Sequence, residues 1–155
     1  MKKIKISLLL SCFIFVFACS HFDTIEKSGR VSESNRKSHN SGEDCMGCHN
    51  KDMTEASIKA WWNIAGTVYR NSGGLNNTAR IELWTEPKAK GLKILSLNTD
   101  KDANFYTEKI INFKGGCYPV AISENDTSFM NSTFNGGGCN GCHDNKTTRK
   151  IWVSQ

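Results

Sequence analysis

The chain has 155 residues, which is enough for one domain and too few for two of ordinary size. Its formal net charge is +5 at pH 7, but three of the 20 lysine and arginine residues (Lys2, Lys3 and Lys5) precede an apolar run at the amino terminus. Without those three, 17 basic residues stand against 15 acidic ones. No later block of lysine and arginine contains interleaved aromatic residues, so we expect no nucleic-acid partner.

The amino terminus has the pattern of an export signal. The apolar run covers residues 6–18, and these 13 residues are fewer than the about 20 that a membrane-spanning helix needs. Residues 1–18 therefore predict a signal peptide. The segment V-F-A-C at residues 16–19 resembles the lipobox of bacterial lipoproteins, which implies a lipid on Cys19. Ser20 after it implies an outer-membrane location, and an ordinary cleaved signal is the alternative; either predicts an exported, extracytoplasmic chain.

A polar segment follows the predicted lipid site. Residues 20–44 contain few apolar side chains, and this composition is typical of solvated, flexible chain. A coil of this length spans about 25–30 Å. The sequence therefore predicts a lipidated flexible tether over residues 19–44 and a folded domain over residues 45–155.

The middle of the chain, at about residues 61–123, predicts a mainly β domain. Apolar or β-branched runs occur at 64–69, 79–84, 92–97, 105–107 and 117–122, with turn-forming residues between them. Short strands at this spacing favour an antiparallel β-sandwich. Residues 65–122 also resemble the carboxypeptidase regulatory-like, or prealbumin-like, β-sandwich in the segments G-T-V-Y, A-R-I-E-L, T-D-K-D-A-N-F-Y and G-G-C-Y-P-V, with Ala103 where that family has Gly. The resemblance implies a scaffold or recognition module without catalytic residues.

The pattern C-x-x-C-H occurs twice, at residues 45–49 and 139–143, in segments that we expect to be short helices flanking the sandwich. Two cysteines three positions apart lie on one helical turn, where each thiol can add across a vinyl group of haem. The histidine after the second cysteine then lies under the iron as its proximal ligand. The sequence thus predicts two c-type haems. The predicted attachment residues are Cys45, Cys48, Cys139 and Cys142, and the predicted proximal iron ligands are His49 and His143.

Three other uses of the paired cysteines remain open. Two C-x-x-C pairs also form Cys₄ zinc sites, although zinc does not need a histidine after each pair, and 90 residues between Cys48 and Cys139 are many for a zinc ribbon. Structural disulfides are common in oxidising compartments. A thioredoxin-like redox pair would need a βαβ context that the sequence lacks.

Two residues are candidates for the distal iron ligands. His39 lies six residues before Cys45 and resembles the histidines of multihaem cytochromes that ligate a neighbouring haem. Met130 lies nine residues before Cys139 and could reach the second iron. A solvated histidine and a packed methionine are the respective alternatives. Cys117, which neither motif uses, is either a small buried hydrophobe or a thiol for an intermolecular disulfide.

Taken together, these features resemble a small exported dihaem c-type cytochrome lipoprotein. The resemblance implies extracytoplasmic electron transfer without enzyme activity, redox partners that include other cytochromes, and a membrane contact through the lipid on Cys19. It leaves self-association open. A haem-based sensor or small redox enzyme is an alternative that requires one iron with an open sixth position, and a surface assembly or adhesion β-module is another.

Overall fold

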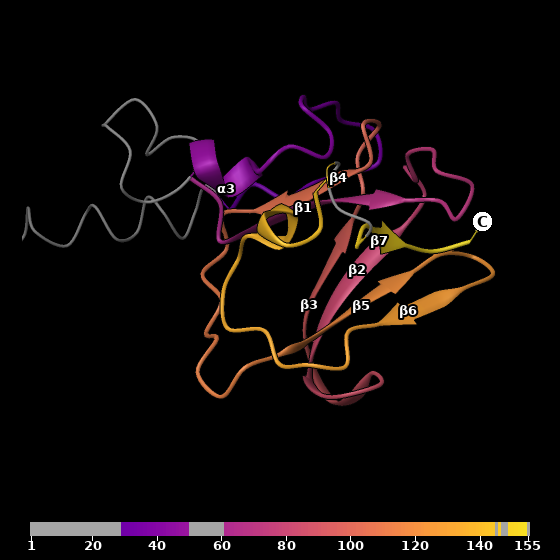
Figure 1. The fold of residues 1–155 in the computed structure, drawn as a ribbon. Coiled ribbons are helices and arrows are strands. Elements are labelled where there is room, and N and C mark those ends of the chain that lie inside the picture. Colours follow the sequence, from indigo (N-terminus) through magenta and orange to yellow (C-terminus); the bar gives the residue numbers. More distant parts are fainter. Residues whose placement is uncertain (1–28, 50–60, 145, 147–148, 155) are drawn as a thin grey trace, which may run out of the picture.

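A computed structural model describes residues 29–49, 61–144, 146 and 149–154, and its ordered core lies between two β-sheets (Figure 1). The first sheet has the order β4-β1-β7, with strands Asn104–Thr107, Ile64–Tyr69 and Ile151–Trp152. The second sheet has the order β3-β2-β5-β6, with strands Lys90–Asn98, Arg80–Glu86, Tyr118–Ile122 and Thr127–Phe129. The short helical elements are the α-helix α3 (Cys45–Cys48) and the 3₁₀-helix η1 (Cys139–Gly141).

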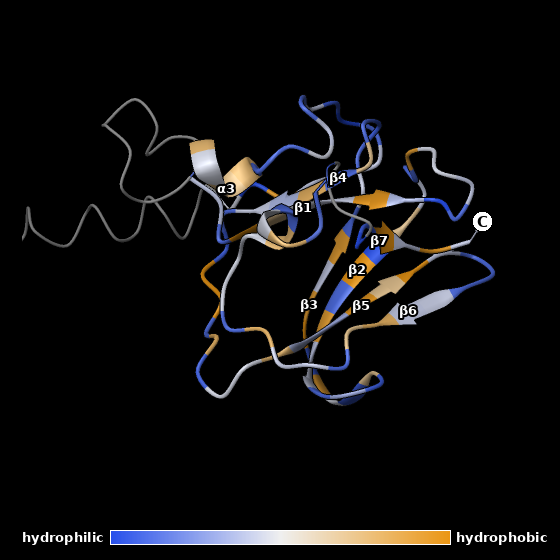
Figure 2. Ribbon diagram, viewed as in Figure 1, coloured by the Kyte–Doolittle hydropathy of each residue, from blue (hydrophilic) through white to orange (hydrophobic). Residues whose placement is uncertain are grey.

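Alternation of apolar and polar residues builds the core from both sheets. On β2, Ile81 and Leu83 point inward and are almost fully buried. They pack in one cluster with Ile64, Val68 and Phe105 of the first sheet. Figure 2 shows hydrophobic residues (orange) alternating with hydrophilic ones (blue) along β2. Burial of these side chains from two layers is what holds the sandwich together.

The predicted mainly β fold with two short helical flanks is confirmed. All five expected strands are present, each within a few residues of its expected bounds. The sequence prediction missed β6 and β7, which have three and two residues and are too short to show an alternating pattern. It also expected antiparallel pairing throughout, but β7 pairs with β1 in parallel. The narrower resemblance to prealbumin-like proteins stays a prediction.

Residues 30–44 belong to the folded domain, so the predicted boundary of the tether at residue 44 is too late. Val31 forms a β-bridge with Thr107, and Ser32 is 3% exposed. The backbone N–H of Gly42 donates to Thr67 Oγ1 at 2.8 Å. The polar composition of residues 30–44 predicts a flexible tether because this segment has no apolar face. Its polar side chains and backbone groups are instead fixed by hydrogen bonds to β1 and β4.

The predicted signal peptide and the lipid site at Cys19 lie outside the described residues. Within the ranges that are described, no helix is long and apolar enough to cross a bilayer.

Ala103, which replaces the expected Gly, has φ +61° and is fully buried. Asp100 makes this left-handed turn possible, because its carboxylate accepts the backbone N–H groups of Asp102 and Asn104, each at 3.0 Å.

Candidate functional site

The two C-x-x-C-H segments, which are 90 residues apart in sequence, meet beside β1 (Figure 1). Residues 137–140 run along the edge of β1 ahead of β7, with Ala65 N–H donating to the carbonyl oxygen of Gly137 at 2.9 Å. Helix α3 packs next to this segment, and a Cβ on Gly138 would lie 3.3 Å from Met46 Cγ. Both motifs therefore share one supporting strand.

The two motifs also share one backbone geometry. His49 N–H donates to the carbonyl oxygen of Cys45 at 2.9 Å, and His143 N–H donates to that of Cys139 at 3.0 Å. In each motif the two cysteines bracket one helical turn, and the histidine begins the next. This is the arrangement that the spacing predicts for thiols and imidazole directed at one ligand.

A cavity of about 320 Å³ opens beside the first motif, and His39 and His49 both line it. Their ring centroids are 5.8 Å apart. Trp62 lies 5.4 Å from His49 and 4.6 Å from Tyr106, also centroid to centroid. The sequence-predicted distal and proximal candidates of the first haem thus lie in one cavity, with two large aromatic rings in its wall.

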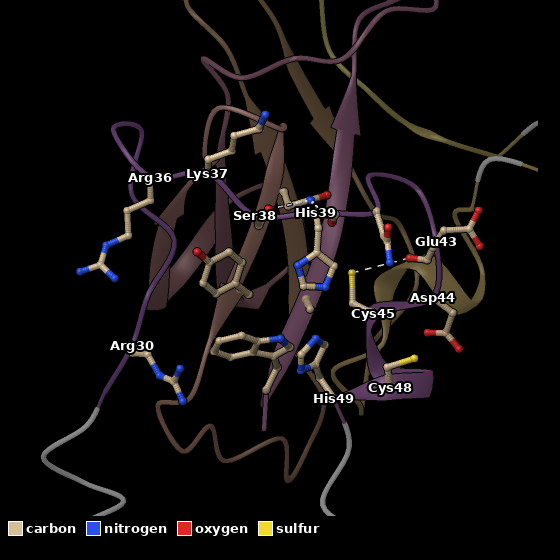
Figure 3. A pocket seen from close by; sticks show the side chains of 15 residues that line it. Arg30, Arg36, Lys37, Ser38, His39, Glu43, Asp44, Cys45, Cys48 and His49 are labelled. Atoms are coloured by element: carbon tan, nitrogen blue, oxygen red, sulfur yellow. Dashed lines mark hydrogen bonds between the residues drawn. The ribbon is translucent and has the colours of Figure 1, made fainter. Parts of the chain in front are cut away.

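The sides of this first cavity differ in chemistry (Figure 3). Cys45 and Cys48 lie on one side of the two histidines, and Arg30 and Arg36 lie on the other. Each arginine already pairs with a carboxylate, Arg30 with Glu108 and Arg36 with a glutamate three residues earlier. The cavity therefore has a thiol side and a cationic side.

A second cavity, of about 260 Å³, opens beside the second motif and between the two sheets. Cys139, Cys142, His143 and Met130 line it together. The rest of the wall is mainly apolar and includes Ile81, Phe105, Pro119, Phe129, Phe134 and Trp152. The second pair of candidates, Met130 and His143, is thus also brought to one cavity, in a more apolar setting than the first.

The hydrogen bonding of His143 fixes which ring nitrogen is available. Its Nδ1 donates to the carbonyl oxygen of Arg149. An Nδ1–H donor leaves Nε2 with its lone pair, and a backbone carbonyl is a common partner for the second nitrogen of a metal-bound histidine. The Nε2 atom of His143 is therefore the ring nitrogen that can ligate a metal.

The first cysteine of each motif is withdrawn from solvent, Cys45 partly and Cys139 almost fully, and this affects the pKa of its thiol. Burial raises the pKa of Cys45 to about 11 and that of Cys139 to about 12. Redox-active and nucleophilic cysteines have lowered pKa values. The thioredoxin-like alternative is therefore disfavoured.

The positions of the possible metal-ligand side chains also argue against the Cys₄ zinc alternative. Within the ranges 29–49, 61–144 and 149–154, no three His, Cys, Asp or Glu side chains converge as metal ligands. A Cys₄ zinc site needs four convergent sulfurs. A haem iron takes only two axial ligands from the protein, so this observation leaves haem unaffected.

Cys117 lies in the hydrophobic core with no exposed surface, and burial raises its pKa. Its Sγ donates to the carbonyl oxygen of Phe134 at 3.4 Å. This position favours the packing role over an intermolecular disulfide, because a partner thiol cannot reach it in the folded chain.

Sequence reasoning missed several residues of these sites. The sequence pattern predicts Tyr106 only as a strand residue, and it places the cationic residues of the first cavity in a tether. Asn140 is not among the predicted site residues, yet it is 1% exposed and fully hydrogen-bonded. The charge pattern of residues 30–37, with three basic residues close to the first motif, was the one signal that could have drawn attention to this wall.

No family model matches the chain, and the comparisons with curated proteins and with solved structures found no match. Function is therefore inferred from the two cavities and the motifs beside them.

Proposed function

We propose that this protein is an electron carrier that binds two c-type haems covalently, one at Cys45 and Cys48 and the other at Cys139 and Cys142. One observation carries the proposal: each C-x-x-C-H segment borders its own cavity, and a second residue able to ligate iron lines the same cavity. A chance pair of C-x-x-C-H sequences would not be expected to come with two such cavities.

The residues of the first cavity fit a haem iron. An imidazole nitrogen lies about 2 Å from a metal that it ligates and about 1 Å from its own ring centroid, so two histidines on opposite sides of one iron have centroids about 6 Å apart. The 5.8 Å between His39 and His49 agrees with that value. Arg30 and Arg36, on the side away from the thiols, suit the carboxylates of haem propionates.

The two aromatic rings of this cavity restrict where a flat macrocycle can lie. A stacked ring needs about 3.5 Å on each face. Trp62 and Tyr106 are 4.6 Å apart, so a flat macrocycle would not fit between these two rings.

The residues of the second cavity also fit. His143 presents Nε2, and Met130 offers a thioether, which is an established iron ligand opposite histidine. Apolar walls exclude water from such a site. Lys150, whose Nζ lies 4.5 Å from the centroid of the Tyr69 ring, is the cationic residue at its rim.

The chemistry that the haems supply is one-electron exchange between ferrous and ferric iron. The chain's own part is to fix the two sites, to exclude water from the second and to choose the axial ligands. A methionine ligand and an apolar wall raise the reduction potential relative to a second histidine in a polar wall. The site at Met130 would therefore have the higher potential, so electrons would run from the first site toward the second.

We further propose that the chain works outside the cytoplasm, anchored through a lipid on Cys19 in the outer membrane. The basic amino terminus, the short apolar run and the lipobox-like segment support this location. The β-sandwich would act as a scaffold, in keeping with the prealbumin-like resemblance, and other cytochromes would be its redox partners.

The test is an optical spectrum and an intact mass of the purified mature protein. Denatured protein should keep its haem absorbance and should weigh two haem masses more than the processed polypeptide. Cys45→Ala and Cys139→Ala should each lower the haem content from two to one. Haem that acid-acetone extracts, or zinc in place of haem, would refute the proposal.

A further inference from the structure

Asn140 occupies a position inside the second motif where haem attachment makes no demand, yet its side chain is almost fully buried. Its Oδ1 accepts the backbone N–H of Thr67 at 3.0 Å. Its Nδ2 donates to Thr67 Oγ1 at 3.0 Å and to the carbonyl oxygen of Glu43 at 2.7 Å. Asn140 therefore ties the second motif to β1 and to the residues that lead into the first motif.

The same amide reaches the first motif itself. Asn140 Nδ2 lies 3.8 Å from Cys45 Sγ, within hydrogen-bonding distance of a sulfur acceptor. The Cys45 thiol also donates to the carbonyl oxygen of Glu43 at 3.6 Å. A thioether has no proton but keeps its lone pairs, so attachment of haem would remove the bond from Cys45 to Glu43 and leave the contact between the sulfur and the Asn140 amide.

The hydrogen-bond network continues to the segment of the first distal candidate. Thr67 Oγ1 donates to Asn104 Oδ1 at 2.6 Å, and Asn104 Nδ2 donates to the carbonyl oxygen of His39 at 3.0 Å. Thr67 is fully buried, and Asn104 is 3% exposed. A buried and satisfied polar network of this kind fixes one arrangement of the groups that it joins.

We propose that Asn140 is a positioning residue that holds the two haem-attachment segments in contact and provides the route for direct electron exchange within one chain. This inference rests on the proposed function. Between the two attachment sulfurs, covalent bonds run from Cys139 to the Asn140 amide, and a single non-covalent step then leads to Cys45 Sγ. In the exchange one electron passes from ferrous to ferric iron, so one centre is oxidised, the other is reduced, and no bond or proton changes.

The experiment measures inter-haem electron transfer in the purified holoprotein after rapid partial reduction. Asn140→Ala should slow the exchange severalfold, because the rate of electron transfer falls steeply as the distance between the two centres increases. Asn140→Ser is the second variant; it keeps a short polar group but cannot reach Cys45 Sγ, and it should slow the exchange as well. Asn135→Ala, an exposed asparagine in the same loop, should leave the rate unchanged.

Haem content by mass separates the possible outcomes. If the unmutated protein holds no covalent haem, the proposed function fails and this inference falls with it. If all variants hold two haems and the Asn140 variants exchange as fast as Asn135→Ala, this inference alone is wrong. Loss of the second haem in both Asn140 variants would also overturn it, because Asn140 would then serve attachment and not exchange. A purely structural role would lower stability without slowing the exchange in variants that still hold two haems.

Discussion

At the scale of single residues, His39 is fixed through its backbone while its ring lies across from His49. The carbonyl oxygen of His39 accepts a hydrogen bond from Asn104, and the preceding Ser38 Oγ accepts another from the same amide at 2.8 Å. A candidate ligand held in this way needs little reorganisation to bind a metal.

We expect His39→Ala to change only the first haem. Loss of the distal imidazole should leave that iron high-spin and able to bind carbon monoxide, as absorption spectra would show.

Met130→Ala is the reciprocal case for the second haem. It should abolish a thioether-to-iron band and lower the reduction potential of that haem in a redox titration. His21→Ala, two residues after Cys19 in the predicted tether, is the control and should leave both spectra unchanged. If the unmutated protein already binds stoichiometric carbon monoxide at one haem, the sensor or enzyme alternative is preferred for that haem.

The residues that the sequence predicts well are those whose spacing has one chemical reason. The structure places both C-x-x-C-H motifs beside cavities that His39 and Met130 also line, and their assignment to haem stays a prediction. Asn140 could not be predicted, because the positions between the two cysteines have no required side chain. Its burial depends on the approach of residues 43–45 from the other end of the domain, which no local pattern reports.

At the scale of elements, the three glycines before the second motif have different roles. A Cβ added to Gly137 would lie 1.8 Å from the backbone oxygen of Asn63, whereas one added to Gly136 would meet no atom within 4 Å. Gly137 therefore permits the close approach of this segment to β1.

Gly137→Ala should lower the free energy of unfolding by about 1–3 kcal/mol, because the clash is with backbone that cannot turn away. Gly136→Ala is the matched control and should change it by no more than about 1 kcal/mol. Denaturant unfolding followed by tryptophan fluorescence measures both. Equal stability of the two variants would show that residues 137–140 do not pack against β1 in this way.

The chain end after β7 is held by a carboxylate on the β5–β6 turn. The backbone N–H of Ser154 donates to Asp126 Oδ2 at 2.7 Å, and this bond lowers the pKa of Asp126 below its usual range. A pKa lowered in the folded state adds stability above the ordinary value, and that stability is lost as the pH falls through the lowered pKa.

Asp126→Asn should therefore reduce the acid sensitivity of the fold. The unmutated protein should lose more of its thermal midpoint between about pH 5 and about pH 3 than this variant loses, since the amide has no charge to titrate. Glu124→Gln, on the same turn and exposed, is the control and should behave like the unmutated protein. An identical loss in Asp126→Asn would contradict the role assigned to this contact.

The sequence predicts the elements whose burial imposes a hydrophobic pattern. It does not predict the segments that are held in place by hydrogen bonds. Strands β1 and β2 form an apolar run and an alternating pattern because both faces of β1 and one face of β2 are buried. Strand β7 has only two residues, and it depends on a parallel pairing with Val68 and Tyr69 that its own sequence does not encode. Residues 30–44 were assigned to a tether for the same reason, because they are fixed by polar contacts.

At the scale of the whole molecule, anchoring and electron transfer should be separable. Cys19→Ala should release the protein from membranes without altering its absorption spectrum, because both cavities are built from residues after position 29. Membrane fractionation with haem-stained gels measures both properties. An unmodified amino terminus on a freely soluble unmutated protein would contradict lipidation.

The outer strand of the larger sheet has a consequence for how the molecules behave at high density. Strand β3 pairs with β2 and lies at the margin of the second sheet, with Leu92 75% exposed. Another chain can pair with an exposed edge strand of this kind and so extend the sheet, which is the first step of aggregation. Here Lys90 and Lys93 place charge along the margin, and two register shifts against β2 increase its twist. Copies crowded on one surface would thus resist joining into a continuous sheet, so any association between them would have to use side-chain contacts elsewhere.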